Sequence, residues 1–528
     1  MKLATLFTDH AVFQRGLPIK IFGEGKGRIK VEFLSSVREE SINDNEWCIT
    51  LPSVDSYGGP YEMKIDLDGE EIILRDLYVG EVWLAGGQSN MEMPLFRTHY
   101  GIDEGRVCEN EMIRFFTVPR RVKRDTPERG WNFEPTDGMD TPWQLCREES
   151  ALHFTAIGYY VAKELCRELN CAVGVISCNW GGKPIEVFIG KEWIKKAECM
   201  RSYCEAQMRL YTDYTEEKFR ECYLLTHKAL DDRFYNANVD VVDRARRLGL
   251  SPTTSYPAGV MPVIPDGPYN PNTNMGILYD SMYSRIIPYG IKGILWYQGE
   301  SNAADGYADK YGVYMECMKE SFENPELDFY AIELASFALD QNVCGTIVHD
   351  RYVTGGGNWA YKREEQELAA RKYKNSYLVT SMELGDAFDI HPKEKRILSH
   401  RMALKALKHS YGFDIYADQP TFKKATFSGN TVTVELDNSE GLYSVSPTNV
   451  FIYLCDESHV MKKADYFIKD GMLILSSPEV EKPTEVRYAF DNYYGGAHIY
   501  NCAGLPLAPF RAVAEAEKNT VIQVRSGD

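Results

Sequence analysis

The sequence predicts an α/β protein, in which a parallel β-sheet with helices on both faces is flanked by an N-terminal and a C-terminal β-sandwich-type domain. Near both ends of the chain, apolar and polar residues alternate, which is typical of half-buried antiparallel strands. Between them, short apolar runs alternate with helical stretches, which is typical of parallel strands buried on both faces. These patterns place the three domains at residues 1–75, 76–411 and 412–528.

The N-terminal domain is predicted from an alternation with a period of two residues between Pro18 and Leu74. Gly23-Glu24-Gly25 and Asp68-Gly69 supply turns between the apolar segments. The apolar positions of the alternation are Ile19, Ile21, Ile29, Val31, Phe33, Tyr61, Met63, Ile65 and Leu67. We therefore expect a small β-sandwich here.

The central domain is predicted from four apolar runs at residues 77–85, 172–178, 291–297 and 377–382, which we interpret as buried strands. The helix expected between the first two carries apolar side chains at spacings of three and four, and Asn170 is expected to end it. Parallel sheets place their chemistry at the carboxyl ends of the strands, so we expect the functional site in the loops that follow these runs.

Two further segments complete the outline. After Gly412 the alternation returns, and Ser428-Gly429-Asn430 and Asp470-Gly471 are expected to be hairpin turns of the C-terminal domain. A charged, tyrosine-rich helical insertion over about residues 191–268 shows neither the alternation nor the apolar runs. We expect it to be either a surface insertion or a wall of the site, because long loops are only sometimes functional.

The composition excludes several classes of protein. The chain has 528 residues, with 59 Lys and Arg against 77 Asp and Glu, and a formal charge of −18. This acidic balance argues against nucleic-acid binding, and no apolar stretch approaches the length that spans a membrane. An odd number of cysteines, 13, without framework spacing favours reduced thiols, and no signal-peptide pattern opens the chain, so we expect a cytoplasmic protein.

Ser89 is the candidate nucleophile. It follows the first apolar run and two glycines in Gly86-Gly87-Gln88-Ser89-Asn90-Met91, where a tight turn would expose its hydroxyl and the start of a helix would offer a backbone N–H to a developing negative charge. The alternative is that Ser89 only caps that helix. After the second and third runs, Asn179-Trp180-Gly181-Gly182 offers backbone N–H groups and Gln298-Gly299-Glu300-Ser301-Asn302 offers polar side chains.

His391 is the candidate general base. Asp389 precedes it by two residues, so both side chains point to the same side of an extended segment and the carboxylate can orient the imidazole. His349 and His400 are the nearest competitors. The order of serine, aspartate and histidine is that of many α/β hydrolases, but a Gly-x-Ser-x-Gly elbow is absent, which disfavours the common α/β-hydrolase fold.

These motifs resemble those of the sialate O-acetylesterases and related carbohydrate acetylesterases of the SGNH (GDSL-like) hydrolase superfamily. The resemblance runs from end to end of the chain. It rests on Gly86-Gly87-Gln88-Ser89-Asn90-Met91, Asn179-Trp180-Gly181-Gly182 with Pro184-Ile185-Glu186, Trp296-Tyr297-Gln298-Gly299-Glu300-Ser301-Asn302 and Asp389-Ile390-His391-Pro392, with further matches at Thr8-Asp9-His10, Gln14-Arg15-Gly16, Arg363 with Gln366, Gly504-Leu505-Pro506 and Pro509-Phe510-Arg511.

The resemblance implies an SGNH-like fold for residues 76–411 and removal of acetyl groups from an acetylated mono- or oligosaccharide, without a metal or organic cofactor. It implies that Ser89 is the nucleophile, His391 the base and then the acid, and Asp389 its orienting partner. The oxyanion hole it implies comprises N–H groups of Ser89 and Gly182 and a side-chain amide, from Gln298 or, second, Asn302. Trp180, Tyr297, Glu300 and Arg363 are candidate sugar-binding residues.

Several alternatives stay open from sequence. The base motif is Asp-x-His rather than the Asp-x-x-His common in the superfamily, so Asp386 or Glu383 could share the orienting role. The substrate could be acetylated xylo- or manno-oligosaccharides rather than sialic acid, because one fold hosts many activities. From another class, the chain could be a non-catalytic glycan-binding protein. Assembly into a homo-oligomer is also open.

Overall fold

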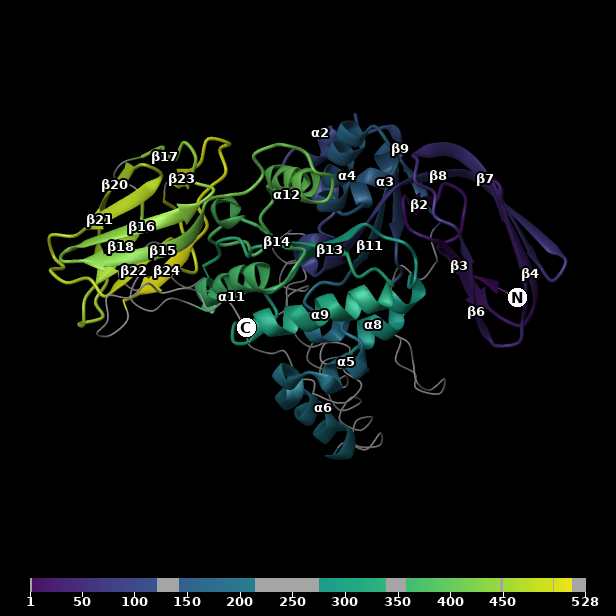
Figure 1. The fold of residues 1–528 in the computed structure, drawn as a ribbon, viewed down its shortest axis with the longest axis horizontal. Coiled ribbons are helices and arrows are strands. Elements are labelled where there is room, and N and C mark those ends of the chain that lie inside the picture. The colour runs from purple at the N-terminus through teal and green to yellow at the C-terminus, as the bar shows by residue number, and fades with distance from the viewer. Residues whose placement is uncertain are drawn as a thin grey trace, which may run out of the picture.

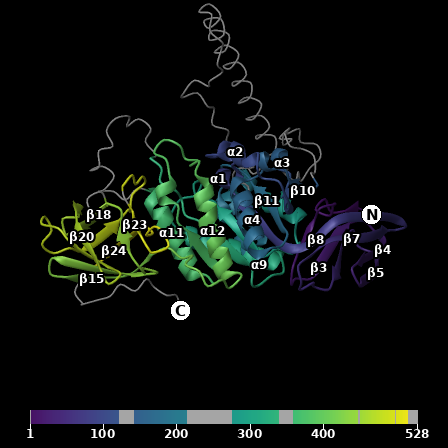
Figure 2. The same cartoon turned by 90° about the horizontal axis from the view of Figure 1, so that it is seen from above.

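The protein consists of three parts in a row. The computed structural model describes residues 2–120, 142–213, 275–338, 358–446, 450–496 and 498–514. The N-terminal strands lie at one end, the central sheet and its helices in the middle, and the C-terminal strands at the other end (Figures 1 and 2). No helix in these ranges is both long and apolar enough to cross a bilayer.

The N-terminal part contains two groups of antiparallel strands around one core. The first group is β1 (Lys2–Leu3), β3 (Ile19–Glu24) and β6 (Glu46–Leu51). The second is β4 (Gly27–Phe33), β5 (Ser36–Ile42) and β7 (Gly58–Leu67), with β7 paired to β8. The alternation in β4 places Ile29, Val31 and Phe33 in the core, as predicted, because successive side chains of a strand point to opposite faces.

Strand β8 (Glu70–Gly87) joins this part to the central sheet. Its first half pairs with β7, and its second half lies between two parallel neighbours in the central sheet. Strand β2 (Val12–Gln14) runs parallel to it at the junction. The boundary expected at residue 75 therefore falls inside one continuous strand.

The central sheet has the strand order β10–β9–β11–β8–β12–β13–β14, and all neighbours are parallel except β10 with β9. The strands other than β8 are β9 (Asn110–Thr117), β10 (Gln144–Cys146), β11 (Val173–Asn179), β12 (Gly293–Tyr297), β13 (Asp328–Ile332) and β14 (Ser376–Val379). All four predicted runs are strands of this sheet. Strands β9, β10 and β13 were not predicted.

Helices cover both faces of the sheet, as the fold class predicts (Figure 1). Along β8, Val82 and Leu84 face the core that contains α9, whereas Trp83 and Ala85 face the core that contains α4 and α12. Residue Asn170 ends α4 in a left-handed conformation with φ of 50°, as predicted. The longer helices are α4 (Ala156–Leu169), α9 (Tyr307–Ser321), α11 (Asn358–Lys372) and α12 (Lys395–His409).

Several further helices of the central part are short. They are α1 (Ser89–Glu92), α2 (Gly101–Gly105), α3 (Glu148–His153) and α8 (Ile277–Ser281), with single 3₁₀ turns at η1 (Leu95–Arg97), η2 (Ile185–Phe188), η4 (Tyr283–Arg285) and η5 (Met382–Leu384). The predicted insertion starts with α5 (Lys191–Lys196), η3 (Glu198–Met200) and α6 (Arg201–Asp213). Its residues 214–268 lie outside the described residues.

The C-terminal part is built of antiparallel strands around one core, in which Val432, Ile452, Leu473 and Val486 are buried. Both predicted hairpins are present, between β15 and β16 and between β20 and β21. The strands are β15 (Thr421–Ser428), β16 (Thr431–Asp437), β17 (Tyr443–Ser444), β18 (Ile452–Cys455), β19 (Lys462–Lys463), β20 (Asp465–Lys469), β21 (Met472–Ser476), β22 (Glu485–Tyr488), β23 (Ile499–Tyr500) and β24 (Phe510–Val513).

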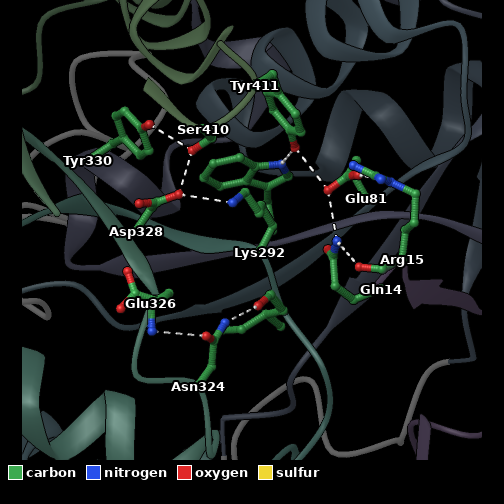
Figure 3. Close-up of polar contacts among 12 residues, drawn as sticks. Gln14, Arg15, Glu81, Lys292, Asn324, Glu326, Asp328, Tyr330, Ser410 and Tyr411 are labelled. Carbon is green, nitrogen blue, oxygen red and sulfur yellow. Dashed lines mark hydrogen bonds and ion pairs between the residues drawn. The ribbon is translucent and has the colours of Figure 1, made fainter. Parts of the chain in front are cut away.

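A polar network lies at the amino edge of the central sheet (Figure 3). The buried carboxylate of Glu81 accepts hydrogen bonds from four side chains, three of the N-terminal part and one that follows α12: Gln14, Arg15, Tyr57 and Tyr411. Beside it, Asp328 accepts from Ser410 at 2.6 Å and pairs with Lys292 at 3.2 Å. These contacts tie the N-terminal part to the sheet and to the end of α12.

Candidate active site

Three loops meet at the carboxyl edge of the sheet because their strands end in register. Gly87 at the end of β8 is level with Asn179 at the end of β11 and with Tyr297 at the end of β12. The loops also contact each other, since Gln88 N donates to Tyr297 O at 3.0 Å and Trp180 N donates to Gly87 O at 3.0 Å. The predicted location of the site at this edge follows from these pairings.

Ser89 opens the short helix α1 and lies beside the imidazole of His391. Its Oγ is 2.8 Å from His391 Nε2, although the two residues are 302 positions apart in sequence. Gly87 permits the turn before it, because a Cβ at this position would come within 2.2 Å of Tyr297 O. Gln88 occupies the N-cap position, so the alternative that Ser89 is only a helix cap is wrong.

His391 is partly open to solvent, with 32% of its side chain exposed, and Asp389 lies on its other side. Asp389 Oδ1 accepts the His391 backbone N–H at 2.9 Å and is 3.6 Å from His391 Nδ1. Asp386 accepts the backbone N–H groups of Phe388 and Asp389 and so shapes the same loop. Glu383 instead pairs with Arg401.

The competing histidines are not part of this arrangement. His400 lies on α12 and contacts Glu164 at 2.8 Å on an exposed surface. His349 lies outside the described residues. Among the described histidines, only His391 is recorded in contact with a serine hydroxyl.

The Gly181–Gly182 loop lies against Ser89. A Cβ on Gly181 would be 3.2 Å from Ser89 Cβ, so the absence of a side chain lets the two loops pack closely. The Gly181 N–H donates to Glu92 Oε2 at 2.7 Å, and the other oxygen of Glu92 pairs with Arg120 at 2.9 Å. For the exposed Gly182, no hydrogen bond to a described residue accounts for its N–H.

Gln298 and Asn302 hold this loop from behind. Gln298 Nε2 is within hydrogen-bond distance of Gln88 Oε1, Lys183 O and Asn302 Oδ1. Asn302 Nδ2 donates to Glu186 Oε2 at 2.8 Å, and its Oδ1 accepts the Ile185 N–H. Both amides are buried with their N–H groups directed at protein oxygens, which corrects the expectation that one of them is free to donate to a reacting oxygen.

Of the four predicted sugar-binding residues, Tyr297 and Arg363 are buried, Glu300 is partly exposed, and so is Trp180. Its ring lies under the ammonium of Lys183, 5.1 Å away. Arg363 is 2% exposed and donates to the backbone oxygens of Leu334 and Asp491, so the structure corrects its assignment. Tyr297 is likewise buried, and the carboxylate of Glu300 points inward to Asn90 at 2.7 Å.

Three charged or polar residues of the site were not singled out from sequence. Glu92 holds Gly181, Asn90 joins the Ser89 loop to the His391 loop, and Lys395 contacts Asn90 from the start of α12. Asn90 and Glu92 lie within the serine loop, but no spacing distinguishes them. The first residue of a helix, such as Lys395, carries no chemical signature in sequence either.

No group of three or more His, Cys, Asp or Glu side chains in the described ranges could hold a metal ion. Ser89 and His391 place a hydroxyl next to an imidazole. Such a pair can transfer an acyl group when the imidazole takes the hydroxyl proton.

Comparison with known proteins indicates the class of reaction. Residues 269–408 match the family model described as carbohydrate esterase, sialic acid-specific acetylesterase. The chain is 22% identical to a sialate O-acetylesterase of Rattus norvegicus, over 89% of this chain and 84% of that protein. It is 23% identical to a sialate O-acetylesterase of Mus musculus, over 78% of this chain and 70% of that protein.

A solved structure is similar along almost the whole chain. A carbohydrate acetylesterase from Xanthomonas citri superposes with a TM-score of 0.73 at 25% identity, and covers 97% of this chain and 99% of its own. A likeness over almost the full length of both chains includes the parts on either side of the central sheet. Together the three comparisons identify the chain as a carboxylic ester hydrolase whose relatives are carbohydrate and sialate O-acetylesterases.

Proposed function

We propose that this protein is a serine esterase that removes O-acetyl groups from sugars by a Ser89–His391–Asp389 mechanism, with O-acetylated sialic acid as the leading substrate. The observation that carries the proposal is the 2.8 Å contact between Ser89 Oγ and His391 Nε2. It lies at the edge of the sheet where ligands of open α/β folds bind. The acetylesterase relatives supply the reaction class.

The reaction proceeds in two steps. Ser89 Oγ bonds to the ester carbonyl carbon while His391 Nε2 takes the hydroxyl proton, and the bond to the sugar oxygen then breaks as His391 returns that proton to it. Water attacks the acetyl-serine with His391 again as base, which releases acetate and restores the hydroxyl. Asp389, at 3.6 Å from Nδ1, stabilises the imidazolium that forms in each step.

Backbone N–H groups stabilise the tetrahedral oxyanion. We assign this role to Ser89 and Gly182, because Gly181 is already bound to Glu92. Gln298 and Asn302 contribute indirectly, by fixing the loop that carries Gly182. Losing one oxyanion donor typically costs about 10²–10³ in turnover.

The leading sugar carries a carboxylate, and cationic groups stand near Ser89. Lys183 and Arg120 both lie close to Glu92, the residue that holds Gly181 against Ser89. Burial lowers the pKa of Lys183 to about 8, with Arg120 acting in the same direction and Glu92 opposing it. The exposed part of Trp180 offers an aromatic face to the sugar. Cytoplasmic location stays a prediction, and it would favour short imported sugars.

Acetate release from matched acetylated sugars tests the proposal. We expect the parent protein to release acetate faster from O-acetylated sialic acid than from acetylated xylo- or manno-oligosaccharides, and Ser89→Ala to release none above background. Ser410→Ala is the control, because this serine lies in the saturated network at the opposite edge of the sheet. Faster acetate release from the neutral oligosaccharides would make them, rather than sialic acid, the substrate. Full activity of Ser89→Ala would contradict the serine mechanism. A parent protein inactive on every ester would favour glycan binding.

A further inference from the structure

A buried lysine stands behind the candidate active site. Lys395 is the first residue of α12, and its side chain is 0% exposed. Its Nζ donates to Asn90 Oδ1 at 2.7 Å and lies 5.0 Å from the centre of the Tyr297 ring. Burying an ammonium group costs several kcal/mol unless other groups compensate, so its place next to the serine loop requires an explanation.

Asn90, which Lys395 contacts, joins three loops of the site. It follows Ser89 directly and is 2% exposed. Its Nδ2 donates to Glu300 Oε1 at 2.7 Å and to Ile390 O at 3.0 Å. Because Ile390 precedes His391, this one amide connects the neighbour of the nucleophile to the neighbour of the base.

The direction of the Asn90 amide depends on Lys395. An amide has one oxygen that accepts and one nitrogen that donates, so both of its nitrogen contacts hold only while Oδ1 faces a donor. Lys395 Nζ is the donor recorded for that oxygen. Without the ammonium group, Oδ1 loses this partner, and the amide is free to rotate and release Ile390 O.

Carboxyl groups on two sides compensate the charge of Lys395. Glu300 and Asp389 both act on it electrostatically, and Glu300 in turn is approached by Lys362, whose Nζ donates to Glu300 O at 2.9 Å. Burial lowers the pKa of Lys395 to about 7, while these carboxyl groups oppose that shift. Burial also raises the pKa of Glu300. The cation therefore sits between the third loop and the loop of the base.

We propose that Lys395 is a positioning residue for the Ser89–His391 pair and that it acts through the side-chain amide of Asn90. The inference rests on the proposed serine-esterase function. Because a displacement of about 1 Å in reacting groups can cost about 10²-fold in rate, loss of this contact should affect turnover more than substrate binding.

The test compares two buried lysines of the same helix. Lys395→Met removes the donor and the charge but keeps an unbranched side chain. Lys405→Met is the matched control, because Lys405 is also buried on α12 but contacts Asp418, away from Ser89. We expect kcat for acetate release to fall about 10²-fold in Lys395→Met with KM nearly unchanged. In folded Lys405→Met, we expect the parent kcat.

A double-mutant cycle tests whether Lys395 acts through Asn90. Asn90→Ala and the double variant Asn90→Ala with Lys395→Met should lose about the same activity as Lys395→Met, because all three break one chain of contacts. A parent-like kcat in folded Lys395→Met, an equal fall in Lys405→Met, or a multiplicative loss in the double variant would each overturn the proposal. If Lys395→Met does not fold, Lys395→Leu, which also lacks a donor, takes its place in the cycle.

The same experiment separates this proposal from the proposed function. Activity that vanishes in Ser89→Ala but persists at the parent level in Lys395→Met overturns only the positioning role. Activity that persists in Ser89→Ala overturns the serine-esterase mechanism itself.

Discussion

The two edges of the central sheet both carry polar clusters, but the clusters differ in how many of their groups are already bound. At the amino edge, Glu81 is fully buried and accepts hydrogen bonds from Gln14, Arg15, Tyr57 and Tyr411. At the carboxyl edge, Ser89 is partly exposed, and among the residues that the structure describes its Oγ contacts only His391.

The difference shows how structural and chemical polar clusters can be told apart in one sheet. A carboxylate that satisfies four donors stabilises the junction of two parts of the molecule and has no capacity left for a ligand. A hydroxyl that meets one imidazole, with solvent access, keeps the capacity to react.

The largest effect is expected at His391. Replacing it with Asn should lower acetate release about 10⁴-fold or more, because the serine loses the group that takes its proton, while the thermal midpoint stays close to that of the parent protein. His400→Asn is the control, since His400 also contacts a carboxylate but no nucleophile. An equal loss of acetate release in His391→Asn and His400→Asn would show that activity does not depend on the contact between His391 and Ser89.

The second effect is expected on stability at the amino edge. Glu81→Ala leaves Arg15 and three other donors without their acceptor, so the free energy of unfolding should fall by about 3–5 kcal/mol. Urea denaturation measures this change. The folded fraction should retain the kcat of the parent. A loss of kcat without a loss of stability would show that Glu81 has a catalytic rather than a structural role.

The third effect is expected on the pH dependence of stability, at a buried histidine that differs from the partly exposed His391. His498 is buried in the C-terminal part, and burial lowers its pKa to about 4. In the unfolded chain the pKa of this histidine is about 6.5, so the unfolded state binds the proton more readily than the folded state. The contribution of His498 to stability is therefore complete above pH 6.5 and is lost as the pH falls toward 4.

Each unit of difference in pKa corresponds to about 1.4 kcal/mol. His498→Phe should therefore reduce the loss of stability between about pH 6.5 and pH 4, as measured by urea midpoints across that range. Unchanged acid sensitivity in the variant would show that His498 binds its proton equally well in both states.

The smallest effect is expected at Glu92. Glu92→Gln weakens the acceptor of the Gly181 N–H, because a charged acceptor binds more strongly than a neutral one, and kcat should fall about tenfold. Glu104→Gln is a suitable comparison, since Glu104 accepts from Tyr159 on another surface. Equal kcat values in parent and Glu92→Gln would mean that Gly181 needs no charged partner.

Much of the fold could be predicted from sequence, because apolar runs and alternation reflect burial directly. Strand β9 was missed because Arg114 interrupts its apolar pattern, and β13 because it has only 5 residues and begins with a charged one, Asp328. In the structure, these polar side chains form hydrogen bonds with segments that are distant in sequence. Arg114, for example, donates to Asp76 O, and Asp328 accepts from Ser410. Such long-range compensation leaves no local signal.

In the site, too, some residues could be predicted from local sequence and others depend on distant contacts. The pairing of Ser89 with His391 could be predicted, because each follows a buried strand in a loop of small and polar residues. The burial of Arg363 could not, because it depends on Asp491, which lies in the C-terminal part of the chain. The part played by Lys395 could not be predicted either, since a lysine at the start of a helix is usually solvated.

The central claim is that Ser89 carries the acetyl group between the sugar and water. The most direct measurement is peptide mass spectrometry after brief incubation with an O-acetylated sialic acid and an acid quench. We expect one added acetyl group on the peptide that contains Ser89, absent from Ser89→Ala and present in Ser410→Ala. Acetate release without any acetylated peptide, or acetylation at another residue, would contradict it.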